Sequence, residues 1–375
     1  MYPPRSKTPT DEIEPFRSSD RSAFLSLYET VFGIERSTDW FRWKYVENPV
    51  ADHVPIVVAR RDGDLIGARS FLPVRVAVDG VERVAYQPCD TMVHPDHRRQ
   101  GVFTRMNEAA IERYAAGEPA FFFNFPNGRS KPGNLKLGWR EVGTVPMYYR
   151  PQKPVSAARE WIANRTDRID EEGAAASELL ERVATDPVAD AHRAIDRRLG
   201  GATDGLTIDR YERPTEAPLE PTYRRAVPEG VHTVRDRAFY EWRFDNPANE
   251  YGVYVASRDG TPVAALIVSL RAGHLRLVDA LPRSVDDDPE PLERLVAAAL
   301  TDRAAGDDVG YVAAFGDVLP RPLRYRFYPD TRFPLSALIR PTTRSLLVRD
   351  LDRSSTVASR SLEDWTLSWF DLDAV

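Results

Sequence analysis

The sequence contains only one cysteine, Cys89, among its 375 residues. A single cysteine excludes an intramolecular disulfide and leaves no cysteine cluster for a metal. The six histidines are scattered, and no two of them form a His-x-x-x-His pair, which further weakens the case for a metal centre. Any chemistry of this chain therefore has to use other groups.

The sequence also lacks a long apolar run. No stretch approaches the roughly 20 uninterrupted apolar residues that a membrane-spanning helix needs. The N-terminal residues 1–16 have no apolar centre of the kind that a secretory signal contains. We therefore expect a cytoplasmic protein that does not act in a membrane.

Lysine is rare and no excess of positive charge is present. Only five lysines accompany 46 arginines, and the formal net charge is −6. A net negative chain is a poor match for nucleic acid, because phosphate binding needs a surplus of basic side chains on one face. The arginine bias suits a GC-rich genome or a salt-adapted host, and composition does not separate these two.

The length points to more than one domain. Single hydrophobic cores usually stop growing at roughly 250 to 300 residues, whereas this chain has 375. Hydrophobic residues make up 42% and charged residues 29%, the balance of a folded protein. We predict a first domain at 1–150, a helical connector at 151–221 that includes a helix at 171–184, and a second domain at 222–375.

The first domain opens with a strand, a helix and three antiparallel strands. Asp62-Gly63 and Asp79-Gly80, each between apolar runs, predict tight hairpin turns. The expected elements are a strand at 13–16, a helix starting near Ser19 and ending at Gly33, and strands at 54–59, 65–71 and 86–93. A helix at 101–116 and an apolar strand at 121–125 follow, and with the preceding strand they form a βαβ unit.

An aromatic motif of the first domain recurs in the second. Residues 43–49 read Trp-Lys-Tyr-Val-Glu-Asn-Pro, and residues 242–247 read Trp-Arg-Phe-Asp-Asn-Pro. In both places an apolar strand ending at an Asp-Gly turn follows, at Asp62-Gly63 and Asp259-Gly260. The alternative is two unrelated aromatic helix ends, but the matched spacing favours a second copy of the fold. The aromatic side chains themselves are expected to be core anchors rather than ligand contacts.

The segment after the fourth strand has the pattern of a phosphate-binding turn. Residues 93–104 read Val-His-Pro-Asp-His-Arg-Arg-Gln-Gly-Val-Phe-Thr. A glycine after a basic run at the start of a helix lets main-chain N–H groups approach a phosphate, and the helix dipole adds favourable charge. A solvated basic turn is the alternative interpretation.

This segment resembles the acyl-CoA signature of the GNAT superfamily of acetyltransferases, Gln/Arg-x-x-Gly-x-Gly/Ala after a strand that ends in Val-x-Pro. The match is at Val93, Pro95, Arg98 and Gly101, and Phe103 departs from the usual small residue. A second family landmark is an Asn, a small residue and a Tyr at fixed spacing before a Gly-aromatic pair, here Gly138-Trp139. Counting back places Asn127, Ser130 and Asn134 at the three positions. The resemblance covers residues 11–150.

The resemblance implies an α/β (α+β) fold of tandem GNAT-like domains, each a mixed, mostly antiparallel sheet flanked by helices, with acetyl-CoA as co-substrate. It also implies that the fourth strand splays from its neighbour, often at a bulge, and that main-chain amides there contact the pantetheine and the thioester. The implied contacts to acetyl-CoA are Met92, Val93, Arg98, Arg99, Gln100, Gly101, Val102, Phe103, Thr104, Asn127 and Ser130.

The acid and base are less defined. Asn134 stands where the family has the tyrosine that protonates the leaving thiolate, so the thiolate leaves unaided or a phenol such as Tyr148 or Tyr149 takes over. Asp90 is the candidate base, with a structural hydrogen-bond acceptor as the alternative. Alternation along the strand would put Cys89 on the opposite face from Asp90, as a core residue.

The second copy lacks the phosphate-binding equipment. Residues 278–288 contain no glycine and end in Asp286, Asp287 and Asp288, which would repel a diphosphate. A helix at 292–305 and a strand at 309–314 keep the shape of the fold. We therefore expect one working acyl-CoA site, in the first domain.

Three functions remain open on the sequence alone. The leading one is transfer of an acetyl group from acetyl-CoA to a primary amine. A related alternative resembles the enhanced-intracellular-survival type of aminoglycoside acetyltransferase, in which the C-terminal carboxylate, here on Val375, would be the base; the chain has too few residues for that group's extra C-terminal domain. The third is a non-catalytic acyl-CoA sensor or partner-binding protein.

Overall fold

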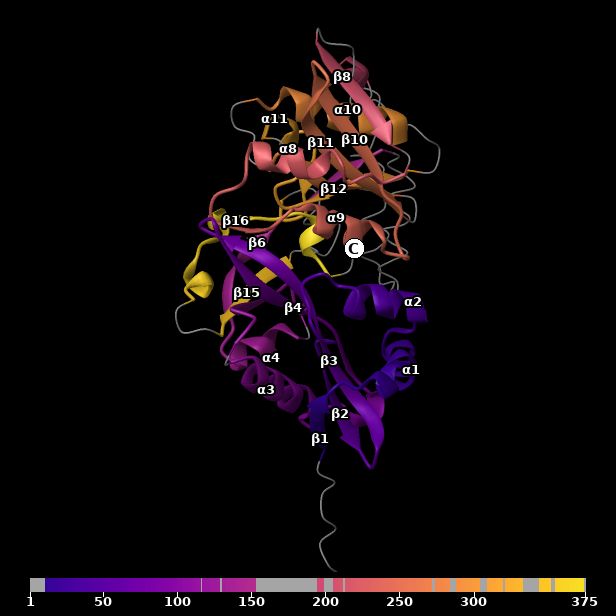
Figure 1. The fold of residues 1–375 in the computed structure, drawn as a ribbon, viewed down its shortest axis with the longest axis vertical. Helices are drawn as coiled ribbons and strands as arrows, with labels where there is room; N and C mark the ends of the chain where they lie inside the picture. The colour runs from indigo at the N-terminus through magenta and orange to yellow at the C-terminus, as the bar shows by residue number, and fades with distance from the viewer. Residues whose placement is uncertain are drawn as a thin grey trace, which may run out of the picture. The chain divides into compact units, whose positions relative to one another are not determined.

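The structure, a computed structural model, describes residues 11–115, 117–128, 130–152, 194–198, 205–211, 213–271, 274–283, 288–303, 309–319, 321–332, 344–351 and 355–373. The chain divides into two compact units (Figure 1). The first contains residues 1–143 and 345–361, and the second contains residues 144–344 and 362–375. Each unit is built on one sheet.

The first unit follows the predicted order of elements. It runs through β1 (Glu12–Pro15), α1 (Arg21–Phe32), α2 (Thr38–Phe41), β2 (Ile56–Arg61), β3 (Asp64–Val78), β4 (Val81–Val93), α3 (Val102–Tyr114), β5 (Phe121–Asn124), α4 (Lys131–Lys136) and β6 (Arg140–Val145). Short 3₁₀ turns stand before α1 and α3, and a π turn (Arg42–Val46) follows α2. Strands β1 to β4 pair antiparallel in sequence order.

Backbone conformation explains the turns of this unit. Gly33 ends α1 at φ +69°, a left-handed conformation that glycine adopts without a steric penalty. In the β2–β3 turn both Asp62 and Gly63 have positive φ, at 53° and 91°, the combination that a two-residue hairpin of matching twist requires. The Asp-Gly signals therefore located the hairpins correctly.

Helices cover both faces of the first sheet (Figure 1). Helix α3 packs on one face, where Ala110 and Tyr114 meet Phe71 of β3 and Phe122 of β5. Helix α1 packs on β3 and β4 with α2 beside it, and its Phe24 contacts Tyr45 edge to face, with the ring centroids 5.8 Å apart. The sheet is therefore buried on both sides around its central strands.

A strand from the far end of the chain completes the first sheet. The strand order is β1-β2-β3-β4-β5-β15-β6, and β15 (Arg344–Asp350) pairs antiparallel with β5. Conversely, β7 (Met147–Pro151) belongs to the second unit, where it pairs with β13 and β14. The predicted boundary at residue 150 therefore places β7 with the first sheet, whereas its pairing is in the second.

The second sheet repeats the first. Its elements include β8 (Leu206–Tyr211), α8 (Leu219–Arg225), α9 (Arg237–Phe244), β10 (Gly252–Arg258), β11 (Thr261–Arg271), β12 (His274–Leu281), α10 (Glu290–Arg303), β13 (Tyr311–Phe315) and β14 (Tyr328–Pro329). The strand order β8-β10-β11-β12-β13-β7-β14 matches that of the first sheet position by position. The predicted tandem of mixed, mostly antiparallel GNAT-like domains is confirmed.

The repeated motif has the same local role in both copies. The Asn48 side-chain oxygen accepts from the Val50 amide at 2.9 Å, and the Asn246 oxygen accepts from the Ala248 amide at 3.0 Å. Each Asn-Pro pair thus forms a turn in which the asparagine side chain holds the backbone two residues on. The preceding tryptophans, Trp43 and Trp242, are buried, as expected of core anchors.

The region predicted as a helical connector is only partly described. Residues 171–184 lie outside the described part, as do Asp286, Asp287 and Val375. Within 151–221, β8 is a strand that opens the second sheet, where helical structure was predicted. No helix of the described residues is long and apolar enough to cross a membrane.

Candidate functional site

The first sheet splits between β4 and β5. These two strands pair in parallel only at Ala85–Phe121 and Tyr86–Phe122, although β4 continues to Val93. On its other edge, β5 pairs with β15 along its whole length, from Phe121 to Asn124. The C-terminal half of β4 is thus free of its parallel neighbour, which is the splayed arrangement that the resemblance implied.

Asp90 lies in a bulge of β4. The register with β3 shifts between Ala68–Met92 and Ser70–Cys89, and Asp90 has a φ of +40°. Aspartate is among the few non-glycine residues that tolerate this region. The bulge also breaks side-chain alternation, because the Tyr45 hydroxyl contacts both the Cys89 sulfur at 3.8 Å and the Asp90 carboxylate. The expectation that Cys89 and Asp90 face opposite sides is wrong for this reason.

The Asp90 carboxylate is anchored on one of its oxygens. Its Oδ2 receives the Lys44 ammonium at 2.6 Å and the hydroxyl of Tyr45. Burial and the Asp90 charge raise the pKa of Tyr45 well above its ordinary value, so this phenol stays a donor. These contacts give Asp90 a structural role, and a role as base stays a prediction.

The main chain of Val93 faces the split. The His94 amide donates to the Ile66 carbonyl at 2.9 Å, which makes that pair hydrogen-bonded. Because bonded and non-bonded pairs alternate in an antiparallel ladder, the Val93 amide points away from β3 and the Met92 amide points toward it. Of the two predicted contacts, Val93 therefore has the better-placed amide for a ligand in the split.

The predicted phosphate loop is a tight turn that leads into α3. Arg99 has a φ of +62°, and Gly101, the N-cap of α3, has a φ of +79°. The first intrahelical bond is from the Arg105 amide to the Gly101 carbonyl. Within the described part of the chain, no acceptor takes a hydrogen bond from the main-chain N–H groups of residues 99–104. This unused set of donors at a helix N-terminus suits an anion.

Buried charge supports the loop from below. Asp11 is buried and pairs with Arg61 at 2.8 Å and with Arg105. Burial alone would raise the pKa of Asp11, but the two guanidinium groups outweigh it and hold that pKa below its ordinary value. Arg61 also donates to the Gln100 side chain at 2.9 Å, and Arg105 to the Gln100 carbonyl at 3.0 Å. The loop is therefore held in shape without using its own amides.

The predicted contacts after β5 lie in the turn before α4. The Asn127 side-chain oxygen accepts from the Ser130 amide at 3.0 Å and from the Ser130 hydroxyl at 3.2 Å. These bonds shape the turn before α4, and ligand contacts by Asn127 and Ser130 stay predictions. Asn134 is fully buried in α4, and neither its side-chain oxygen nor its nitrogen has a hydrogen-bond partner in the described structure.

Two features near the loop were missed by the sequence reasoning. A Cβ on Gly133 would lie 2.7 Å from the Cε1 atom of Phe103, so the phenylalanine of the loop packs directly on α4. Arg69 of β3 is also near that ring, because its guanidinium carbon is 5.8 Å from the ring centroid and its side chain is buried. The absence of a side chain at Gly133 makes room for the large Phe103 side chain at a position where the family usually has a small residue.

Tyr148 lies in a different part of the molecule from the one predicted. It is on β7, which pairs with Ala314 and Pro329 in the second unit, and it packs against that unit's core. Its role as an acid stays a prediction.

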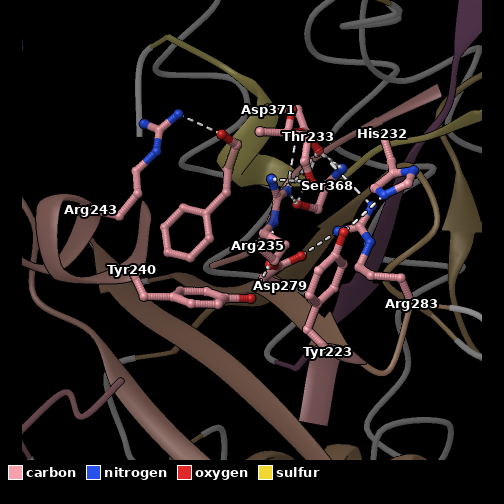
Figure 2. Close-up of polar contacts among 11 residues, drawn as sticks. Tyr223, His232, Thr233, Arg235, Tyr240, Arg243, Asp279, Arg283, Ser368 and Asp371 are labelled. Carbon is pink, nitrogen blue, oxygen red and sulfur yellow. Dashed lines mark hydrogen bonds and ion pairs between the residues drawn. The ribbon is translucent and has the colours of Figure 1, made fainter. Parts of the chain in front are cut away.

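The second unit contains a buried polar cluster at the equivalent place in its sheet (Figure 2). The register of β11 and β12 shifts between Ile267 and Val268, and Asp279 lies next to that irregularity. Asp279 accepts from Arg235 at 2.9 Å, from the Tyr240 hydroxyl at 3.1 Å and from Arg283. Both copies thus have an aspartate at the bulge that accepts hydrogen bonds from a cationic side chain and from a tyrosine hydroxyl.

The C-terminal segment, residues 365–372, contacts the diverging ends of β12 and β13. The Asp317 amide, just after β13, donates to the Leu367 carbonyl at 2.8 Å, and the Trp369 ring lies over Arg276 of β12. Asp371 completes the cluster by pairing with Arg235 at 3.0 Å. Strands β12 and β13 pair from His274–Tyr311 only as far as Leu277–Ala314. The segment therefore lies at the position in the second sheet that corresponds to the open split of the first sheet.

Comparison with known proteins gives matches to one fold. The chain is similar to a GCN5-related N-acetyltransferase from Anabaena variabilis, with 10% identity, a TM-score of 0.61 and coverage of 92% of this chain and 73% of that one. It is similar to Eis1 from Mycobacterium abscessus, with 12% identity, a TM-score of 0.54 and coverage of 94% and 76%. It is also similar to a tandem GNAT protein from the clavulanic acid biosynthesis pathway, with 13% identity, a TM-score of 0.53 and coverage of 92% and 100%. No curated protein matches the sequence.

The two sheets, the split between β4 and β5 and the loop before α3 together define a tandem GNAT fold. The sequence of residues 12–142 matches the model of a family described as acetyltransferase (GNAT) domain. Over these residues the chain is similar to GNAT acetyltransferases, and its structural matches share the fold.

Proposed function

We propose that the protein transfers an acetyl group from acetyl-CoA to a primary amine by direct attack of the amine on the thioester. The observation that carries this proposal is the set of unused main-chain N–H groups at residues 99–104, beside the open end of β4. They match the diphosphate of an acyl-CoA, and the exposed Arg99 adds positive charge. The Val93 amide, which points away from β3, supports the proposal as a donor to the oxyanion that forms at the thioester.

The second unit is proposed to take no acyl-CoA. Its C-terminal segment lies against the diverging strands, and its Asp371 carboxylate pairs with the arginine cluster. We therefore propose a packing role for the second unit and binding of the acceptor amine by the first unit.

Asn134 favours a second candidate function, a non-catalytic acyl-CoA sensor, because it stands where the family tyrosine would be. Turnover separates the two. Release of free CoA thiol, measured with a thiol-reactive dye over a panel of amines and amino sugars at several salt concentrations, is expected for the enzyme. A protein that binds acetyl-CoA but releases no thiol with any amine belongs to the sensor class.

The loop itself is tested by a pair of glycine substitutions. Gly101→Glu places a carboxylate where the diphosphate would lie, so we expect acetyl-CoA affinity measured by calorimetry to fall at least 100-fold. Gly80→Glu is the matched control, because Gly80 has a similar φ of +78° but lies in the β3–β4 turn with no atom within 4 Å of an added Cβ. Equal affinity in the two variants would remove the loop from the proposed site.

A further inference from the structure

Arg69 is a buried cation for which the described part of the chain supplies no carboxylate partner. Its side chain is 2% exposed, and its Nη1 donates to the Thr91 hydroxyl in the bulge of β4. Its Nε and Nη2 atoms have no hydrogen-bond partner in the described structure, and no described carboxylate pairs with it. Burial lowers the pKa of Arg69 to about 10, so the group remains charged at neutral pH. Such a desolvated charge is costly unless a ligand compensates it.

The surroundings of Arg69 place this charge beside the proposed thioester site. Arg69 stands on β3 opposite the bulge, immediately before the point where the Val93 amide turns toward the split. The rings of Phe71 and Phe103 lie 5.6 Å and 5.8 Å from its guanidinium carbon. Because Phe103 is in the first turn of α3, this contact brings the guanidinium near the start of that helix.

Asn134 is next in the chain to the glycine on which the Phe103 ring packs. Phe103 packs on Gly133, the residue before Asn134 in α4. The Asn134 amide is fully buried, and neither of its polar atoms has a partner among the described residues, which is rare unless a ligand or a water satisfies them. Arg69 beside Phe103 and Asn134 next to Gly133 thus each have unused N–H donors in the described structure. The rings of Phe71 and Phe103 make the surroundings of Arg69 apolar, which suits a large, weakly hydrated anion.

We propose that Arg69, assisted by the Asn134 amide, stabilises the CoA thiolate as it leaves, in place of the acid that Asn134 cannot supply. The inference rests on the proposed function. In the reaction the amine nitrogen forms a bond to the thioester carbonyl carbon, and the C–S bond breaks with its electron pair going to sulfur. The amine proton goes to a base or to water, and the thiolate takes a proton from solvent when CoA is released. The cation replaces proton transfer at sulfur by charge stabilisation.

The test compares the binding of CoA and desulfo-CoA, which lacks the sulfur, by calorimetry at pH 7.5 in buffers of different ionisation enthalpy. A thiol has an ordinary pKa of about 8.5, and a nearby cation in a dry site lowers it by about two units. CoA should then bind about tenfold more tightly than desulfo-CoA and release close to one proton on binding.

Three variants separate charge from structure. Arg69→Met is expected to bring the affinity ratio to about one and to abolish proton release, whereas Arg69→Lys, which keeps the charge, should retain most of both. Thr91→Val removes only the hydroxyl partner of Arg69 and should leave the ratio unchanged. A purely structural role for Arg69 would not move the ratio between the two ligands.

The outcomes also separate this inference from the proposed function. If wild-type protein binds neither CoA nor desulfo-CoA, the proposed acyl-CoA site is wrong. If it binds both equally without releasing a proton, or if Arg69→Met keeps the tenfold preference, the thiolate role of Arg69 is overturned while the acyl-CoA site stands.

Discussion

At the residue scale, arginine side chains make the buried ion pairs and hydrogen bonds of the second unit. Arg235 bridges Asp279 and Asp371 inside the second unit, and burial of its charge is compensated by those two carboxylates. Arg243 is also buried and donates to the Phe370 carbonyl at 2.5 Å. The arginine bias of the composition is therefore also used in the interior, where the planar guanidinium can make several bonds at once.

His232 gives this cluster a pH dependence that can be measured. Burial, together with the positive charges of Arg235 and Arg283, lowers the pKa of His232 to about 4. The histidine pKa in the unfolded chain is near 6.5. Between about pH 4 and pH 6.5, the unfolded chain therefore binds a proton at His232 that the folded state does not bind. Stability then falls as pH drops through this window, by about 2 kcal/mol between pH 7.5 and pH 5.

Urea unfolding of wild type and His232→Gln at these two pH values tests the effect. In the variant, the difference in the free energy of unfolding between pH 7.5 and pH 5 should be smaller than in wild type by roughly 2 kcal/mol. His53→Gln is the control, because His53 pairs with the exposed Asp52 in the first unit. An unchanged pH difference in His232→Gln would show that this histidine is not the group responsible.

Single residues also mark what the sequence could and could not predict about the site. Gly101 was predictable, because a glycine after a basic run at a helix start is a local signal. Arg69 was not, since one arginine in a strand is normally taken as an exposed side chain and only the tertiary fold buries it. The bulge at Asp90 was equally hidden, because the alternation rule assumes an unbroken ladder.

At the element scale, the contact of α3 with α4 depends on a pair of residues, Phe103 and Gly133. An alanine normally stabilises a helix interior relative to glycine by about 1 kcal/mol. At Gly133 the added methyl would lie 2.7 Å from the Phe103 ring, so we expect Gly133→Ala to destabilise the protein by about 1 to 3 kcal/mol instead.

Thermal unfolding of a small variant set checks this packing. Phe103→Leu combined with Gly133→Ala should recover much of the loss, because the shorter side chain vacates the contact. Gly128→Ala is the control, since nothing lies within 4 Å of an added Cβ there. Stabilisation by Gly133→Ala alone would contradict the close contact.

Local elements of both sheets were predictable, but their partners were not. Hydrophobic periodicity located β2, β5 and α3 to within a few residues, because these signals lie within short windows. The strands expected at 65–71 and 86–93 are longer in the structure, where β3 ends at Val78 and β4 begins at Val81. The pairing of β15 with β5 joins residues more than 200 positions apart, such as Leu347 and Asn124. Nothing in a local pattern specifies such a partner, and for this reason the boundary at residue 150 placed β7 with the first sheet.

At the scale of the whole molecule, the two halves of the chain each supply a strand to the other half's sheet. Strand β15 lies between β5 and β6 in the first sheet, and its Leu347 is fully buried in that core. Arg349 of the same strand donates to the Leu137 carbonyl after α4. The first unit therefore requires residues from the last tenth of the sequence to close its sheet.

This exchange predicts that residues 1–150 do not fold as a stable unit by themselves. Without β15, β5 keeps only its short parallel pairing with β4 and exposes an apolar edge, because Phe121, Phe122 and Phe123 are buried in the intact unit. We expect the fragment to show no cooperative unfolding by circular dichroism and no calorimetric binding of acetyl-CoA. Fusing residues 344–351 to it through a flexible linker should restore both, whereas the same fusion carrying Leu347→Asp should not. Cooperative unfolding of the bare fragment at the midpoint of the full chain would mean that β15 adds nothing to the first sheet, and the dependence of the loop on the distant strand would then have to be abandoned.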